Sequence, residues 1–370
     1  MSDRNRDGDT RMDDPRAEGT DRDAVPQPTE ERAETAGTMT KLPTSDPSAT
    51  GVFDAYEELD QRRPIASTNG GKARLGDRIF TALTTGAAGF VILVVLLVAI
   101  FLVVQSVPSI LDDKANFLFS TDWNTNPKEL SFGVAALAYT TVLIALIALL
   151  FAVPVAIGIA LFITQYAPRR VARPVANVID LLAAIPSIIY GVWGIRVLAP
   201  ALEPVQRALS HIGLGLFADQ GINTGTVFDG GVVLAIMILP IITAISRDVF
   251  ERTPTANREA ALALGATRWE MVRMAVLPYG RAGVVSGSML GLGRALGETI
   301  AVYLILSKVG VFDPSILSGG ETIASKIALA QAEFGANPGP YIAAGLVLFV
   351  LTFVVNAAAR AIVNRRGDFV

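Results

Sequence analysis

Six apolar segments, each long enough to cross a lipid bilayer, limit what this chain can fold into. They lie near residues 80–106, 133–165, 175–200, 228–250, 279–307 and 340–363. A transmembrane helix needs about 20 mostly apolar residues. Inside lipid, only helices and closed barrels satisfy all of their backbone hydrogen bonds. The sequence therefore predicts an all-α membrane protein with six transmembrane helices.

The chain ahead of the first apolar segment has a different composition. Residues 1–78 contain 17 acidic and 12 basic residues, whereas the much longer stretch 79–370 contains 17 and 19. A segment so rich in charge, proline and small polar residues cannot bury enough apolar surface to offset the entropy of ordering it. We expect residues 1–75 to form a disordered acidic tail and residues 76–370 to form one membrane domain.

Missing residue types and motifs exclude several kinds of chemistry. The chain has no cysteine and one histidine, which rules out disulfides and thiolate metal sites and argues against a histidine-rich metal centre. It contains no G-x-x-x-x-G-K-[ST] phosphate loop, so it is not its own P-loop ATPase. We expect a non-catalytic subunit without metal or cofactor, to which a partner supplies energy.

Basic residues mark one side of the predicted membrane domain. They gather before the first apolar segment, between the second and third, between the fourth and fifth, and after the sixth: Lys72, Arg74, Arg78, Arg169, Arg170, Arg173, Arg247, Arg252, Arg258, Arg268, Arg273, Arg281, Arg360, Arg365 and Arg366. Because Lys and Arg prefer cytoplasmic loops, both termini are predicted to be cytoplasmic.

A short charged segment, residues 252–278, connects the fourth and fifth apolar segments. In it, Glu259, Ala260 and Ala261 are followed by Gly265. Gly265 can take the left-handed conformation that ends a helix, so we expect two short helices joined at this glycine. Capping signals alone are typical of an ordinary helical hairpin between two spans.

Local signals predict where those two short helices begin and end. Thr253 and Pro254 suit the N-cap and first turn of the first helix. Thr267 and Glu270 have the spacing of a capping box at the start of the second. Pro278 is expected to stop that second helix.

The fifth apolar segment carries the strongest signal for a substrate site. Gly283, Gly287 and Gly291 recur every four residues and predict a face that packs closely on other helices. Arg294 and Glu298 follow near the same face. Arg294 is 15 residues beyond Tyr279, or about 22 Å along a helix, so it is expected near the bilayer midplane. A lone charge there costs roughly 2.5–3.5 kcal/mol.

Two interpretations of this charged pair remain open from the residues alone. As an i,i+4 ion pair, Arg294 and Glu298 could simply hold helices in register. Alternatively, Arg294 meets an anion in transit, since its planar fork suits an oxyanion, while Glu298 keeps the empty site neutral. Ser286, Ser288 and Thr299 could add hydroxyl donors, although hydroxyls in membrane helices often bond their own backbone.

Several blocks of sequence resemble known transporters. The spacing of Glu259-Ala-Ala, Gly265 and Leu277-Pro278 resembles the EAA loop of ABC importer permeases, which docks on a separate ATPase; Ala275 departs from the usual Ile. The blocks at 180–194, 238–250 and 291–299 resemble the PstC family of phosphate-importer permeases. The resemblance covers about residues 80–365 and has no counterpart for the long tail.

That resemblance carries specific expectations. It implies the type I ABC importer permease fold in a bacterial cytoplasmic membrane, with residues 252–278 as the coupling loop. It implies a PstA-like sister permease, a dimer of a PstB-like ATPase and an extracytoplasmic phosphate-binding protein as partners, and no nucleic acid. Substrate binding is then expected at Arg294, Glu298, Thr299 and Ser288, and ATPase coupling at Glu259, Ala260, Ala261 and Gly265.

Two other functions stay open at this point. An ABC permease for sulfate, molybdate or phosphonate would use the same arginine chemistry. A channel or secondary transporter could use Arg294 and Glu298 as a gate or proton relay. The charged loop at 252–278 argues against the latter, because a secondary carrier has no ATPase to dock.

Overall fold

The computed structural model describes residues 75–126, 128–211, 215–218, 221, 224–309, 311–329 and 337–367. The chain divides into two compact units, Met1–Ile79 and Phe80–Val370. The predicted acidic tail, residues 1–75, lies outside the described residues except for Leu75. Its disorder stays a prediction.

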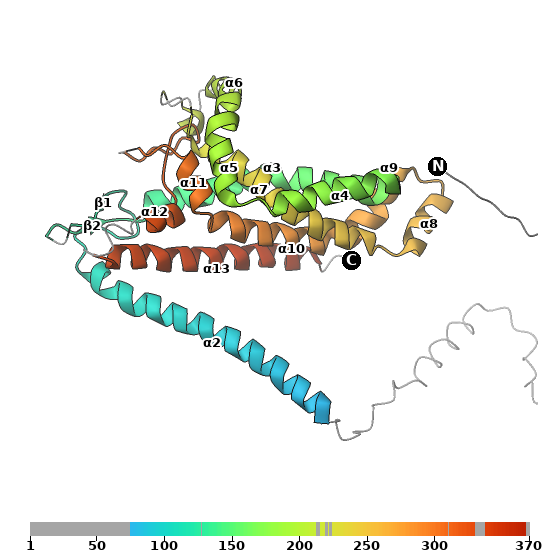
Figure 1. The fold of residues 1–370 in the computed structure, drawn as a ribbon, viewed down its shortest axis with the longest axis horizontal. Coiled ribbons are helices and arrows are strands. Elements are labelled where there is room, and N and C mark those ends of the chain that lie inside the picture. The colour runs from blue at the N-terminus through green and yellow to red at the C-terminus, as the bar shows by residue number, and fades with distance from the viewer. Residues whose placement is uncertain are drawn as a thin grey trace, which may run out of the picture. The chain divides into compact units, whose positions relative to one another are not determined.

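The described part of the chain is helical apart from one two-stranded sheet (Figure 1). Its first half contains α2 (Leu75–Leu111), β1 (Trp123–Asn124), β2 (Ser131–Phe132), α3 (Ala135–Leu161), the π-helical η2 (Phe162–Tyr166), α4 (Arg169–Ala183), α5 (Ser187–Trp193), the π-helical η3 (Gly194–Leu198), α6 (Ala199–Ser210) and η4 (Gly215–Phe217). β1 and β2 pair antiparallel.

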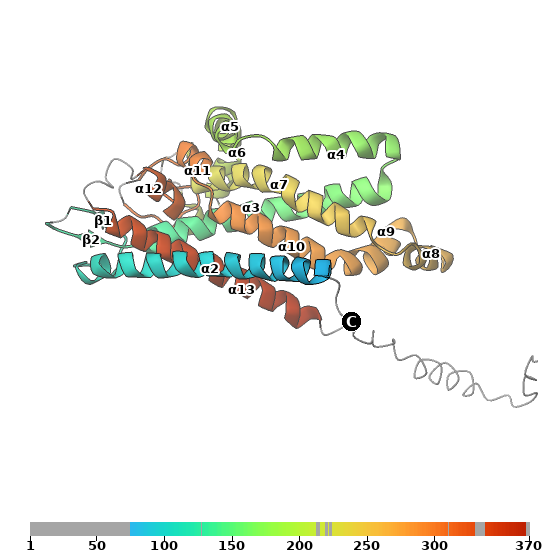
Figure 2. The same ribbon diagram turned by 60° about the horizontal axis from the view of Figure 1, so that its bottom comes forward.

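The second half contains the elements that form the candidate site. They are α7 (Val227–Glu251), α8 (Thr255–Ala263), α9 (Arg268–Met271), the π-helical η5 (Val272–Val276), α10 (Leu277–Leu296), α11 (Ile300–Ile305), α12 (Ile323–Leu329) and α13 (Gly339–Gly367). α8 and α9 lie at one end of the bundle, whereas β1, β2 and α12 lie at the other (Figures 1 and 2).

Five helical stretches of the described residues are long and apolar enough to cross a membrane: Leu75–Leu111, Ala135–Tyr166, Ser187–Ser210, Val227–Glu251 and Gly339–Ala358. Two predicted segments differ from the structure. The third begins at Ser187 instead of near 175, because the chain breaks before Pro186 and α4 is a separate amphipathic helix. The fifth, predicted at 279–307, is divided into α10 and α11.

The core forms where α7 packs between α3 and α10 (Figure 2). The face of α3 toward α7 is small and fully buried at Ala148, Ala152 and Ala156. On the other side, a Cβ added at Gly283 would lie 2.2 Å from Val249 Cγ2 of α7. Such close approach leaves no room for a side chain, which confirms that the glycine face of α10 packs inward.

The segment between α7 and α10 is the predicted helical hairpin, residues 252–278. Gly265 has φ +85°, as its position between the two helices requires. Thr267 and Glu270 form the predicted capping box, in which the Glu270 N–H donates to Thr267 Oγ1 and the Thr267 N–H donates to Glu270 Oε2. At the start of the hairpin, Pro254 is the N-cap, and the buried Thr253 hydroxyl makes no cap bond. The prediction of a Thr253 cap was therefore wrong.

Pro278 does not stop a helix, contrary to expectation. α9, η5 and α10 run on without interruption, and Pro278 lies in the first turn of α10. Proline lacks the N–H that would bond the carbonyl four residues earlier. The chain compensates with a wider π-helical turn, in which the Leu277 N–H donates to the Val272 carbonyl. The π-helical turns η2 and η3 likewise end two residues before Pro168 and Pro200.

Candidate functional site

The helix that carries Arg294 is broken immediately after it. α10 ends at Leu296, and α11 begins at Ile300. Arg294 lies in the last turn of α10, where the helix dipole favours a cation. Glu298 lies between the two helices, and its Oε1 accepts from the Ala301 N–H at 3.3 Å, at the start of α11 where the dipole favours an anion. The break therefore stabilises both charges separately.

Arg294 and Glu298 do not form the expected ion pair. The i,i+4 spacing brings two side chains together only on a continuous helix, and Gly297 leaves the helix between them with φ −95° and ψ 1°. Within the described part of the chain, neither side chain makes a salt bridge. The interpretation of a register-holding pair thus loses its geometric basis, while the site residues themselves stay predictions.

Arg294 lines a groove of about 900 Å³ between α7, α10 and α13. We call this the α10–α13 groove; its lining residues are Ile241, Ile245, Ala282, Val285, Ser286, Met289, Leu290, Gly293, Arg294, Asn356 and Arg360. Its walls are mostly apolar, and its polar groups are two guanidinium groups, one amide and one hydroxyl. Arg294 is half-buried there.

The other predicted substrate residues occupy different surroundings. Ser288 is buried, and its hydroxyl donates to the Val284 carbonyl of its own helix at 2.8 Å. It does not line the groove, whereas Ser286 does. Thr299 is half-buried at the N-cap of α11 without a side-chain cap bond. The structure thus brings Arg294 and Ser286 to one groove. It places Glu298 and Thr299 at the break between α10 and α11.

A second broken helix lies against the first. α4 ends and α5 begins around Pro186, and the Tyr190 hydroxyl bridges the break by donating to the Leu182 carbonyl at 2.8 Å. Tyr190 lies within electrostatic reach of Arg294. A Cβ added at Gly191 would lie 2.9 Å from the Ala301 Cα, so α5 touches α11 closely. Two discontinuous helices in contact are a recurrent way to build a substrate site inside a membrane.

The predicted coupling residues lie together on the hairpin. Glu259, Ala260 and Gly265 are exposed, and Ala261 is half-buried against the apolar side chains of α9 and η5. Two apolar side chains beside them are also exposed, Leu264 at 90% and Trp269 at 57%. Exposed apolar side chains next to a rigid, capped turn are typical of a surface that a partner covers.

Sequence reasoning did not identify Asn356 and Arg360 as groove residues. From the sequence, Arg360 contributed only to the predicted orientation, and Asn356 was assigned no role. Both lie one turn apart on α13, more than sixty positions from Arg294, so only the packing of α13 on α10 brings them into the groove. The only sequence signal for either groove residue was a polar side chain near the end of an apolar segment.

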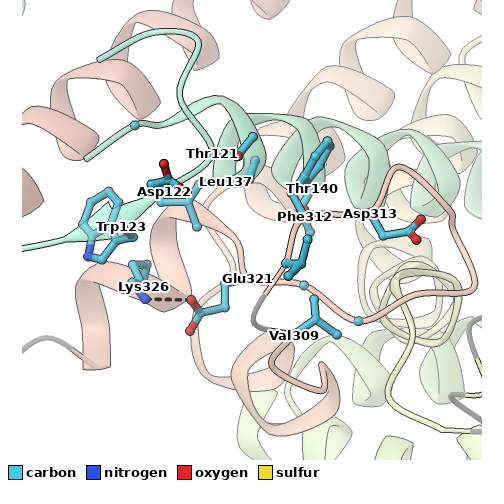
Figure 3. Close-up of a pocket in the computed structure, with 15 residues that line it drawn as sticks. Thr121, Asp122, Trp123, Leu137, Thr140, Val309, Phe312, Asp313, Glu321 and Lys326 are labelled. Atoms are coloured by element: carbon cyan, nitrogen blue, oxygen red, sulfur yellow. Dashed lines mark hydrogen bonds and ion pairs between the residues drawn. The ribbon is translucent and has the colours of Figure 1, made fainter. Parts of the chain in front are cut away.

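A second cavity, of about 340 Å³, lies beside β1 and α12 (Figure 3), at the end of the bundle opposite the hairpin (Figure 1). Lys326 points into this region, but its Nζ bonds Glu321 Oε2 at 2.8 Å and lies 5.5 Å from the centre of the Trp123 ring. Asp122 and Asp313 also line it. Acidic side chains outnumber the basic one, so this cavity is a poorer place for an anion than the α10–α13 groove.

Comparisons with known proteins identify the family of this chain. A family model described as "Binding-protein-dependent transport system inner membrane component" matches residues 152–368. The "Phosphate transport system permease protein PstC 2" of Mycobacterium tuberculosis is 55% identical over 301 residues, 78% of this chain and 92% of that protein. The "Phosphate transport system permease protein PstC" of Xylella fastidiosa is 42% identical over 314 residues, 81% of this chain and 95% of that protein. Among solved structures, the inward-facing MetNI methionine ABC transporter matches with a TM-score of 0.45 and 18% identity, over 63% of this chain and 95% of its own.

Proposed function

This chain belongs to the family of binding-protein-dependent transport system inner membrane components, and we propose that it is the permease subunit of an ATP-driven importer that moves inorganic phosphate into the cell. Its fold is that of a type I ABC importer permease. The two relatives cited above carry the name of phosphate transport permeases, and the chain matches them over nearly their whole length. The substrate given in those names supports phosphate as the substrate here.

One observation carries the mechanism: Arg294 stands at a helix break with no carboxylate of the described residues paired to it, and it faces a groove. A guanidinium group donates two parallel hydrogen bonds to paired phosphate oxygens. We propose that Arg294 binds phosphate in transit and that Ser286, instead of Ser288, supplies a nearby hydroxyl. Glu298 and Thr299 shape the break, and the Glu298 carboxylate limits how tightly the anion is held.

The partners follow from the family and from the hairpin. A permease of a binding-protein-dependent system receives substrate from a binding protein, here an extracytoplasmic phosphate-binding protein. We propose that a PstA-like sister permease completes the membrane unit and that a dimer of a PstB-like ATPase docks on Glu259, Ala260, Ala261 and Gly265. The exposed Leu264 and Trp269 side chains support docking at this surface.

The protein is an inner-membrane component by family, and its orientation is part of the proposal. The basic residues of the hairpin and of the α13 C-terminus lie at the same end of the bundle (Figure 1). Because basic loops stay in the cytoplasm, that end is assigned to the cytoplasm, together with both termini. ATP is found on that side, where the hairpin is free to meet an ATPase.

Uptake by the assembled importer in vesicles tests the substrate and the energy source together. We expect radiolabelled phosphate to accumulate only with ATP on the hairpin side and the binding protein on the other. Accumulation of sulfate, molybdate or a phosphonate, with phosphate excluded, would identify a different oxyanion permease. Phosphate flux without ATP would instead favour a channel or a secondary transporter.

A further inference from the structure

One arginine lines the α10–α13 groove near each of its two ends. Its α10 wall runs from Ala282 to Arg294, which is about 18 Å at 1.5 Å per residue. α10 and α13 run in opposite directions beside one another (Figures 1 and 2). The C-terminal part of α13, with Arg360, therefore lies toward the hairpin end of the groove, and Arg294 lies toward the opposite end.

Polar groups follow one line down the α13 wall. Asn356 and Arg360 are spaced i,i+4, so their side chains lie one above the other on the same face of the helix. Asn356 is half-buried and Arg360 is exposed. Polar residues in membrane helices usually face the bundle interior or a water-filled cavity. Their alignment with the Arg294 groove therefore indicates a hydrated path instead of a lipid-facing surface.

Every charged side chain that lines this path is positive. No acidic residue is among those that line the groove, and its two cations are Arg294 and Arg360. Ile241 and Ile245 of α7 form part of an apolar wall, and apolar walls strengthen the field of a charge because they screen it poorly. Such a groove concentrates anions and repels cations along its length.

We propose that the α10–α13 groove is the exit path of the translocated anion and that Arg360 is its selectivity residue at the cytoplasmic mouth. This inference rests on the proposed function. An anion held by Arg294 alone would leave slowly, whereas transport needs sites weak and numerous enough to pass the ion on. Asn356 offers a neutral donor at an intermediate depth, and Arg360 draws the anion toward the cytoplasm.

Single cysteines test the path directly, because the chain has none of its own. We would introduce Asn356→Cys or Ser286→Cys, assemble the full importer, and measure on this subunit the rates of reaction with anionic and cationic thiol reagents of equal size. Phe353→Cys is the control, since Phe353 lies on the same helix, is 72% exposed and does not line the groove.

The expected result is a preference for the anionic reagent at both groove cysteines, on the order of tenfold for a nearby unit charge. Adding Arg360→Gln should reduce that preference several-fold, and free phosphate should slow the reaction. Groove cysteines as unreactive as the one at 353, or an unchanged preference after Arg360→Gln, would overturn the inference by identifying a lipid-facing or helix-covered surface.

Transport rates separate this inference from the proposed function. Arg360→Gln should lower the maximal rate of phosphate uptake several-fold and leave the half-saturating phosphate concentration unchanged, because capture occurs outside. Arg170→Gln, which removes an exposed arginine of α4 outside the groove, should transport normally. If Arg294→Gln is inactive while Arg360→Gln transports normally, the exit-path inference is wrong and the proposed function stands. If Arg294→Gln also transports normally, the proposed phosphate mechanism itself fails.

Discussion

At the scale of single residues, the helix break explains how two opposite charges persist in an apolar segment without pairing. Arg294 lies in the last turn of α10, and the Glu298 carboxylate accepts a hydrogen bond from the Ala301 N–H at the start of α11. Each charge lies at the helix end whose dipole stabilises it, worth about 0.3–1 kcal/mol at exposed ends and up to about 2 kcal/mol when partly buried. The guanidinium group consequently stays available to a ligand, which a tight ion pair would prevent.

Arg294→Gln is expected to remove phosphate uptake while the complex still assembles. A neutral amide fits the same place at the end of α10 but cannot replace a cation that donates two parallel hydrogen bonds. Arg294→Lys should recover only part of the rate, since it keeps the charge and loses the planar fork. Uptake in vesicles, normalised to assembled complex, is the measurement. Full uptake by Arg294→Gln would exclude a direct role in anion binding.

Two substitutions of Glu298 should separate the effect of its charge from the effect of its hydrogen bond with the Ala301 N–H. Gln still accepts a hydrogen bond from the Ala301 N–H, so Glu298→Gln is expected to assemble normally but to release phosphate slowly and transport slowly. Glu298→Ala also loses the hydrogen bond from the Ala301 N–H, at a cost of about 1 kcal/mol, and should assemble less well. Thermal stability and uptake of both variants are the readouts. Equal loss of stability in Gln and Ala would contradict this division.

The swap of Arg294→Glu with Glu298→Arg distinguishes a binding role from a simple ion pair. It would place an anion at the C-terminus of α10 and a cation at the N-terminus of α11, against both dipoles. We expect it neither to assemble well nor to transport. Full phosphate uptake by the double variant would return the pair to a purely structural role.

At the scale of elements, the hairpin depends on the left-handed backbone of Gly265. A Cβ there would meet nothing within 4 Å, so the constraint is conformational and not steric crowding. Gly265→Leu should distort the turn between α8 and α9, leave the protein in the membrane, and lower both uptake and substrate-stimulated ATP hydrolysis. Gly265→Asn is the matched control, because asparagine tolerates this conformation, and should retain most coupling. Normal stimulated ATP hydrolysis in Gly265→Leu would contradict a coupling role.

The capping box of α9 should make the hairpin sensitive to acid. Hydrogen bonds from the Thr267 backbone N–H and hydroxyl lower the pKa of Glu270 below its usual value. A group with a lowered folded pKa contributes stability that is complete above its unfolded pKa and is lost as the pH falls through the folded pKa. Amide exchange across 268–271, corrected for intrinsic rates, should therefore rise on acidification in that window. Glu270→Gln keeps the bonding pattern without titrating and should flatten this dependence; an unchanged dependence would contradict the assignment.

The ends of the helices show which features of the fold are determined by the local sequence. Gly265 and the Thr267–Glu270 box were predictable because each acts within one turn of chain. The role of Pro278 was not, since a π-helical turn at Val272–Val276 absorbs the missing N–H and allows the helix to continue. The break at Gly297 was missed for a related reason: the hydropathy of 279–307 is continuous, and glycine alone does not reveal where a helix ends.

At the scale of the whole molecule, hydropathy located the membrane segments except for the start of the third and the break within the fifth, but it could not assemble the groove. Arg294 was identifiable as a lone charge in an apolar segment. Asn356 and Arg360 join it only through the packing of α13 against α10, a contact between distant parts of the sequence. The family resemblance indicated a substrate class. The helix break and the second arginine come from tertiary structure.

The acidic tail is expected to be dispensable for transport. Residues 1–75 carry many charges and prolines and no sustained apolar face, and such composition favours a chain that does not join a packed core. The groove, the helix break at Gly297 and the hairpin all lie within residues 241–360. Deletion of residues 2–70, which retains the basic residues Lys72, Arg74 and Arg78 for orientation, should therefore leave phosphate uptake per assembled complex within about twofold of the full chain, since surface changes away from packed or functional features usually cost at most 0.5 kcal/mol. Membrane abundance and uptake are measured together. Abolished uptake at unchanged abundance would show that the tail takes part in translocation.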